Sequence, residues 1–239
     1  MNIRWRAHAY RDGDALFEAR VYWDDDRAEP RPGVLVSHAW RGRSDFENGR
    51  AEAMARLGYI GFALDLYGKG ILGRNNEENQ RLMQPFMQDR AKLQQRMKLA
   101  LAEIRRLPEV DPSRVAATGF CFGGLCVLDL ARSGADLRAV ASFHGLLDPP
   151  GNTAGRRFEG MVLVLHGWDD PMAPPEKVVR LGQELSSMGA DWQVHAYGKT
   201  LHAFTNPAAA DPAHGLMFNA LANERSTRAL QSFLAEAFW

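Results

Sequence analysis

The segment that most constrains the fold is residues 119–124, which read GFCFGG and directly follow the apolar run 115–118. Glycines two residues on either side of Cys121 have the spacing of a nucleophile elbow, with cysteine in the position usually held by serine. Such a turn leads from a strand into a helix, and glycines fit where the two elements crowd together. The turn would raise the Cys121 thiol above the carboxyl edge of a sheet. It would also place the Phe122 N–H at the start of a helix, where an oxyanion can be received.

Two polar loops later in the chain each follow a run typical of a strand. Residues 161–165 are uniformly apolar and lead to Asp169 and Asp170, and residues 192–197 alternate and lead to His202. A nucleophile, an acid and a histidine in this order, each after its own strand, are typical of the α/β-hydrolase fold. The sequence therefore predicts that these loops meet at the carboxyl edge of one sheet.

The three candidate catalytic residues have separate roles. Cys121 would be the nucleophile. His202 would take the thiol proton or form an ion pair with the thiolate, then protonate the leaving group and later activate water. Asp170 would hold the imidazole tautomer and stabilise its charged form. The spacing from Gly167 and the proline four residues later favour Asp170 over its neighbour Asp169, which is then a turn or capping residue.

Composition narrows the class of protein. The chain has 239 residues, of which 46% are hydrophobic, and this suits a single α/β domain over residues 1–239. Lys and Arg together number 29, as do Asp and Glu, so no excess of positive charge indicates nucleic acid or a membrane surface as partner. No apolar run approaches the roughly 18 residues of a membrane-spanning helix, and the first residues lack the apolar stretch of a signal peptide.

The cysteine pattern indicates a free thiol. Cys121 and Cys126 are the only cysteines, and on a turn and the following helix their side chains should point in different directions. A disulfide is therefore not expected, and a reducing cytoplasm suits a nucleophilic thiol. Because no C-x-x-C pair or H-E-x-x-H motif is present, we expect no metal site. The expected partner is a small molecule, and the expected oligomeric state is a monomer or a homodimer.

Apolar strands alternate with helical segments along most of the chain. This pattern predicts a mainly parallel sheet of about eight strands, flanked by helices on both faces. The polar residues 75–84 are expected at the rim of the site. Helices are expected after the elbow and over about 47–57, 86–107, 175–188 and 217–237, with strands near 3–9, 15–23, 33–37, 59–64, 115–118, 139–144, 161–165 and 192–197.

Loops at the expected carboxyl edge complete the candidate site. An oxyanion hole needs two donors, for which we expect the backbone N–H groups of Phe122 and of Trp40 in the loop after the third strand. His38 either orients that loop or is structural, His166 is expected to be structural, and His144 lines the pocket or packs behind it. A largely apolar substrate pocket is expected from Phe46, Tyr67, Lys69, Phe143, His144, Phe204 and Asn206.

With these residues assembled, the chain resembles the dienelactone hydrolase family. The matching segments are residues 65–67, 119–124, 170–174, 202–204 and 222–225, and together they extend over most of the chain. The resemblance implies an α/β-hydrolase domain without a cofactor. It also implies cleavage of an ester or lactone through an acyl-cysteine intermediate.

Two departures from the family pattern bear on the substrate. The family's glutamate in the loop after the third strand corresponds to Ala39 here, or to Trp40 after a shift of one residue. Two arginines that hold a substrate carboxylate correspond to Lys69 and Asn206. Lysine keeps the charge without the bidentate fork and asparagine keeps neither, so neutral esters are expected in place of an anionic dienelactone. The alternative is a carboxylate clamp rebuilt by one of the nearby arginines, which are Arg41, Arg43, Arg74 and Arg81.

Three functions fit this set of residues. The first is hydrolysis of small, mostly neutral carboxylic esters or lactones. The second is attack of the same thiolate on an activated phosphotriester, to which slow dephosphorylation of cysteine is the chemical objection. The third is a non-hydrolytic relative that binds a small ligand, against which the acid and histidine in register with Cys121 argue.

Overall fold

The computed structural model describes all residues from 1 to 239, and the chain divides into two compact units. The first unit comprises residues 1–118 and the second comprises residues 119–239. No helix is both long enough and apolar enough to cross a membrane.

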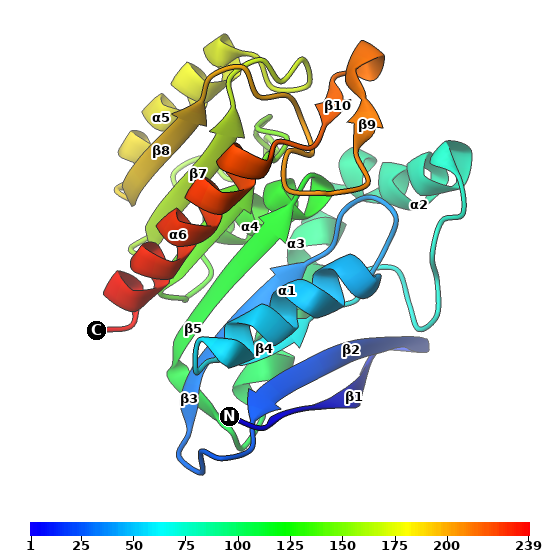
Figure 1. The fold of residues 1–239 in the computed structure, drawn as a ribbon. Helices are drawn as coiled ribbons and strands as arrows, with labels where there is room; N and C mark the ends of the chain where they lie inside the picture. Colours follow the sequence, from blue (N-terminus) through cyan, green and yellow to red (C-terminus); the bar gives the residue numbers. More distant parts are fainter. The chain divides into compact units, whose positions relative to one another are not determined.

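The first unit contains a long antiparallel hairpin followed by parallel strands. β1 (Ile3–Asp12) pairs with β2 (Ala15–Asp24) along its whole length, and β2 pairs antiparallel with β4 (Ile60–Ala63). β3 (Arg31–Ser37) runs parallel to β4, and both strands are buried on both faces. α1 (Asp45–Arg56) and α3 (Arg90–Arg105) lie on opposite faces of these strands (Figure 1). α1 packs so closely on β4 that a Cβ at Gly61 would lie 1.9 Å from the carbonyl oxygen of Ala51. β5 (Val110–Phe120) begins in this unit.

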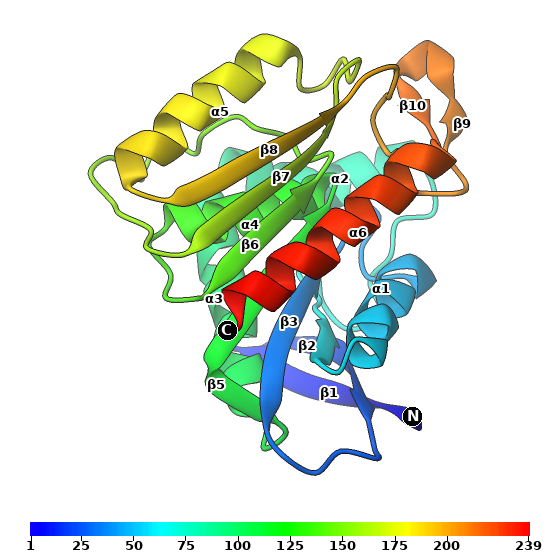
Figure 2. The same ribbon diagram turned by 60° about the vertical axis from the view of Figure 1, so that its left-hand side comes forward.

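The second unit is built on three parallel strands. β6 (Ala139–Phe143), β7 (Met161–Gly167) and β8 (Asp191–Tyr197) pair in that order. α4 (Phe122–Arg132), which is buried over its whole length, and α6 (Ala220–Ala237) lie on opposite faces of them, and α5 (Pro175–Met188) packs on β8 (Figure 2). A small ribbon of β9 (Ala210–Asp211) and β10 (Leu216–Met217) enclosing a 3-10 turn (Pro212–His214) precedes α6.

The strand order is β1-β2-β4-β3-β5-β6-β7-β8, in an eight-stranded sheet of mixed but mainly parallel pairing. The predicted α/β fold with about eight strands and helices on both faces is therefore confirmed. The hydrophobic runs that predicted the buried strands do form them, because strands covered by helices on both faces need apolar residues at successive positions.

Two predictions of secondary structure were wrong in detail. The segment 75–84, whose place at the rim of the site stays a prediction, belongs largely to α2 (Asn76–Gln88), which begins after the N-cap Asn75. The single helix expected over 86–107 is interrupted at Asp89, whose φ of −123° and ψ of 87° end α2 and whose side chain caps α3. The last helix begins at Ala220, not at 217, because Asn219 accepts a hydrogen bond from the Ala222 N–H and caps it there.

Candidate active site

The elbow at Cys121 has the strained geometry that its glycine spacing predicts. Cys121 joins β5 to α4 with φ 56° and ψ −118°, a conformation that non-glycine residues rarely adopt. A Cβ at Gly119 would lie 2.1 Å from the carbonyl oxygen of Gly123, so only glycine fits at this point of the turn. Backbone strain of this kind persists only where the surrounding structure holds it. Phe122 takes the first position of α4, where helical N–H groups have no partner within the helix.

A buried carboxylate orients the imidazole of His202. Nδ1 of His202 lies 2.7 Å from Oδ2 of Asp170, and each residue is 1% exposed. Oδ1 of Asp170 accepts a hydrogen bond of 2.8 Å from the Met172 N–H, which fixes the plane of the carboxylate. Asp169 is exposed, and its N–H donates to the carbonyl oxygen of Thr200. The structure therefore brings Asp170, and not Asp169, into contact with His202.

The loop that carries His202 is held on two sides. On one side, the Trp168 and Asp169 N–H groups donate to Tyr197 and Thr200 and connect the acid loop to the histidine loop. On the other side, the His202 N–H donates to Gly215 at 2.9 Å, and its carbonyl oxygen accepts from Met217 at 3.1 Å. The β9–β10 ribbon thus supports the backbone of His202, a role that its two-residue strands gave no sequence signal for.

The electrostatics of His202 favour an imidazolium. Burial lowers its pKa, but the negative charge of Cys121 and the hydrogen bond with Asp170 outweigh burial and raise the pKa to about 10. A raised pKa favours the charged form of the ring beside the Asp170 carboxylate. The structure has no group of three or more His, Cys, Asp or Glu side chains that could hold a metal ion.

Three residues of the predicted substrate pocket are almost completely buried in the second unit. Phe143 packs on Phe120 at the end of β5, with ring centroids 4.7 Å apart. His144 lies edge-on to His202 at 5.0 Å and to Phe204 at 5.1 Å. His144 therefore contacts both the ring of His202 and the ring of Phe204.

Two other second-unit residues are also engaged locally. Asn206 is half-buried, and its Oδ1 accepts a hydrogen bond from the Ala208 N–H of its own loop. His166 is buried on β7 without a hydrogen bond at either ring nitrogen, and burial lowers its pKa. His166 is therefore a neutral core residue next to the acid turn.

In the first unit, a neutral histidine joins the loops after β3 and β4. Nδ1 of His38 bonds the carbonyl oxygen of Ala39 at 2.7 Å, and Nε2 accepts from the Leu66 N–H at 3.2 Å. Burial lowers the pKa of His38, which agrees with this pattern of one donating and one accepting nitrogen. The Tyr67 hydroxyl donates to the carbonyl oxygen of Trp40 at 2.9 Å, so the predicted oxyanion loop is fixed from both ends.

A glutamate does reach the loop after β3, although it comes from α1. Oε1 of the buried Glu47 accepts from the Ala39 N–H at 3.1 Å, and Oε2 accepts from the N–H and hydroxyl of Ser44. Sequence reasoning missed Glu47, but the Ser44-x-x-Glu47 capping box that begins α1 was a readable signal for it. The half-buried Phe46 lies under the guanidinium of Arg50 at 4.9 Å.

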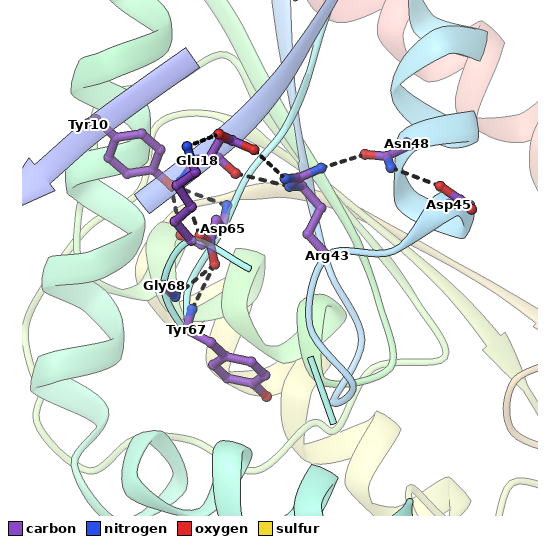
Figure 3. Close-up of polar contacts among 9 residues, drawn as sticks. Tyr10, Glu18, Arg43, Asp45, Asn48, Asp65, Tyr67 and Gly68 are labelled. Carbon is purple, nitrogen blue, oxygen red and sulfur yellow. Dashed lines mark hydrogen bonds and ion pairs between the residues drawn. The ribbon is translucent and has the colours of Figure 1, made fainter. Parts of the chain in front are cut away.

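Asp65 anchors the loop after β4 (Figure 3). Its Oδ1 accepts from the N–H groups of Tyr67 and Gly68, and its Oδ2 accepts from the Glu18 N–H. The Tyr10 hydroxyl donates to its carbonyl oxygen at 2.7 Å. Through these contacts, the segment Asp65-Leu66-Tyr67 supports the loop after β4.

The cationic groups near this loop already have acidic or polar partners. Nζ of Lys69 lies 2.8 Å from Oε2 of Glu18, and this hydrogen bond lowers the pKa of Glu18. Arg43 donates to the carbonyl oxygen of Glu18 and to Oδ1 of Asn48, as Figure 3 shows. The remaining candidate clamp residues are engaged as well, Arg41 with the carbonyl oxygen of Gly73, Arg74 with Glu78 and Arg81 with Glu77.

Known proteins are similar to this chain in both sequence and fold. A sequence profile of the dienelactone hydrolase family matches residues 17–238. A solved protein called m3DLH is 38% identical with a TM-score of 0.93. A dienelactone hydrolase-like promiscuous phosphotriesterase from metagenomic libraries is 36% identical with a TM-score of 0.94, and both alignments cover 100% of each chain. A protein of Aquifex aeolicus, provisionally named carboxymethylenebutenolidase, is 27% identical over 73% of this chain and 77% of its own length. The chain therefore belongs to the dienelactone hydrolase family and is a hydrolase of the ester and lactone class.

Proposed function

We propose that this protein hydrolyses small, mostly neutral carboxylic esters or lactones through an acyl-cysteine intermediate. Cys121 is the nucleophile, His202 the acid and base, and Asp170 the group that orients His202. The observation that carries this proposal is the buried 2.7 Å contact between Asp170 and His202, in the same unit as the strained turn at Cys121. The raised pKa of His202 supports a protonated imidazole beside the Asp170 carboxylate.

The first half of the reaction forms a thioester. The Cys121 thiolate attacks the carbonyl carbon, and the electron pair of the C=O bond moves onto oxygen. The Phe122 N–H at the start of α4 receives this oxyanion. The second donor predicted from the sequence, the Trp40 N–H, belongs to the other unit and stays a prediction. Collapse of the intermediate breaks the C–O bond, and His202 gives its proton to the departing alkoxide.

The second half of the reaction releases the acid. The now neutral His202 takes a proton from water, and the resulting hydroxide attacks the thioester carbonyl. Collapse breaks the C–S bond, releases the carboxylic acid and expels the Cys121 thiolate, and His202 keeps the proton that it took from water. Asp170 favours the tautomer with the proton on Nδ1, so that Nε2 faces the reacting atoms throughout.

The charges of the first unit support a neutral substrate. Lys69 is paired with Glu18, and Arg43 is held by the Glu18 carbonyl and Asn48. In the second unit, Asn206 turns its side-chain oxygen into its own loop. A substrate carboxylate would therefore compete with existing partners for these groups.

A panel of p-nitrophenyl esters and lactones tests the proposal. Cys121→Ala should abolish turnover, and mass spectrometry of the native enzyme after a brief exposure to ester should show one added acyl group. The matched control is Cys126→Ala, which removes the other, buried thiol from α4. Full activity in Cys121→Ala, together with loss in Cys126→Ala, would contradict the assignment of the nucleophile.

A second candidate function is hydrolysis of activated aryl phosphotriesters. The 36% identical phosphotriesterase, which matches over the full length of both chains, favours it. The thiolate would attack phosphorus and expel the aryloxide, and water would then have to release the phosphoryl group from sulfur. Sustained release of nitrophenol that is lost in Cys121→Ala would support this activity. A burst of one equivalent without turnover would reduce it to an inactivation reaction.

A further inference from the structure

We infer that His144 is a positioning residue that fixes the separation of Cys121 and His202. The inference rests on the proposed roles of those two residues and adds a fourth side chain to the constellation. His144 follows β6, is almost completely buried and is joined by hydrogen bonds to both catalytic loops.

The ring of His144 connects the nucleophile to the histidine loop. The Cys121 N–H donates to Nδ1 at 3.1 Å, in addition to the carbonyl oxygen of Phe143 at 3.0 Å. Nε2 lies 2.8 Å from Oγ1 of Thr205, a buried residue three positions after His202. One rigid imidazole therefore spans from the backbone of the nucleophile to the loop that carries the base.

The hydrogen bonds of His144 define its protonation state. Because Nδ1 accepts from a backbone N–H, it carries no proton, and the single ring proton lies on Nε2 and is donated to Thr205. A cationic His144 would place a second N–H against that of Cys121. Its ring lies edge-on to His202 with centroids 5.0 Å apart, so a neutral ring also avoids a second positive charge beside the imidazolium.

Backbone strain is concentrated at the residues that His144 connects. Positive φ occurs at Cys121 (56°), at His144 itself (37°) and at Ala203 (58°), directly after His202. The backbone N–H of His144 donates to the carbonyl oxygen of Leu165 at 2.8 Å, which ties the backbone of His144 to β7. Such strain needs fixed neighbours, and His144 is the group that contacts both strained loops.

Three variants separate the two hydrogen bonds. His144→Phe removes both, and we expect kcat to fall about 100-fold with KM unchanged, because small misplacements of catalytic groups have effects of this size. His144→Asn keeps an acceptor near Nδ1 and tolerates a positive φ, and Thr205→Val removes only the partner of Nε2, so each should cost about tenfold or less. The control is His195→Phe on β8, whose ring contacts Gln193 and should leave kcat unchanged.

The deciding measurement is the pH profile of Cys121 alkylation by iodoacetamide, made in a Cys126→Ala background so that one thiol reacts. If His144 positions the pair, the midpoint of the profile moves to higher pH in His144→Phe, and by less in His144→Asn and Thr205→Val. The inference would be overturned if the alkylation profile stayed native in all three variants and kcat stayed native in His144→Asn and Thr205→Val. Alkylation reports on Cys121 without any turnover. An active Cys121→Ala variant would therefore contradict the proposed function, whereas the alkylation profile decides the inference about His144.

Discussion

The substitution Asp170→Asn should lower kcat for a p-nitrophenyl ester by about 10⁴-fold while the fold is kept. The structure supplies the reason. Oδ1 of Asp170 accepts from the Met172 N–H, so the carbonyl oxygen of the new amide would stay on that side. Its NH₂ group would then point at Nδ1 of His202, where Oδ2 now lies at 2.7 Å. Nδ1 would then have to accept, which disfavours the imidazolium because that form carries a proton on both nitrogens. The remaining proton would lie on Nε2, and His202 could no longer act as a base there.

The loss corresponds to about 5.5 kcal/mol of transition-state stabilisation, since each tenfold change in rate is about 1.4 kcal/mol. Steady-state kinetics of the native enzyme and of the Asp170→Asn and Asp169→Asn variants measure it, with thermal unfolding as the check on folding. Asp169 is exposed and holds the neighbouring loop through its backbone N–H, so Asp169→Asn should stay within about twofold of native. A larger effect from Asp169→Asn than from Asp170→Asn would refute the reasoning.

Three further predictions concern substrate charge, pH and the elbow. For a matched pair of esters, kcat/KM should favour the neutral one over its carboxylate-bearing analogue by about tenfold or more, because Lys69 is already paired with Glu18; a preference for the anion would contradict this. Burial lowers the pKa of His166 below its ordinary value of 6.5, so as the pH falls below 6.5 the unfolded chain binds a proton more readily than the folded one, and stability falls by at most about 1.4 kcal/mol per pH unit. Urea unfolding at about pH 7 and about pH 5 should show a shallower loss in His166→Gln than in the native protein, and identical slopes would count against it. Gly119→Ala should cost about 1–3 kcal/mol of stability and at least about 100-fold in kcat, because its Cβ would meet the Gly123 carbonyl oxygen at 2.1 Å; near-native kinetics would show that the elbow can relax.

Features that follow from local chain geometry could be predicted from the sequence. The glycines around Cys121 predicted a strained strand-to-helix turn, because the steric demand of that turn acts on residues only two positions away. The apolar runs that became β3, β4, β6 and β7 predicted buried strands, because a strand covered on both faces needs apolar residues at successive positions. Spacing from Gly167 also selected the aspartate that lies against His202. The boundary between α2 and α3 was missed, since Asp89 resembles other polar residues of a helix until its capping role is seen.

Contacts between distant residues were decided only by the tertiary structure. His144 and Thr205 are 61 positions apart, and nothing in either segment indicates that one hydrogen bond would join them. The same holds for Lys69 and Glu18, whose pairing removes a free cation from the loop after β4. Buried polar groups need partners, but the sequence does not say which ones, because many segments could supply a donor or an acceptor. Local spacing thus selects Cys121 as the proposed nucleophile, whereas the groups that contact it depend on which loops the fold brings together.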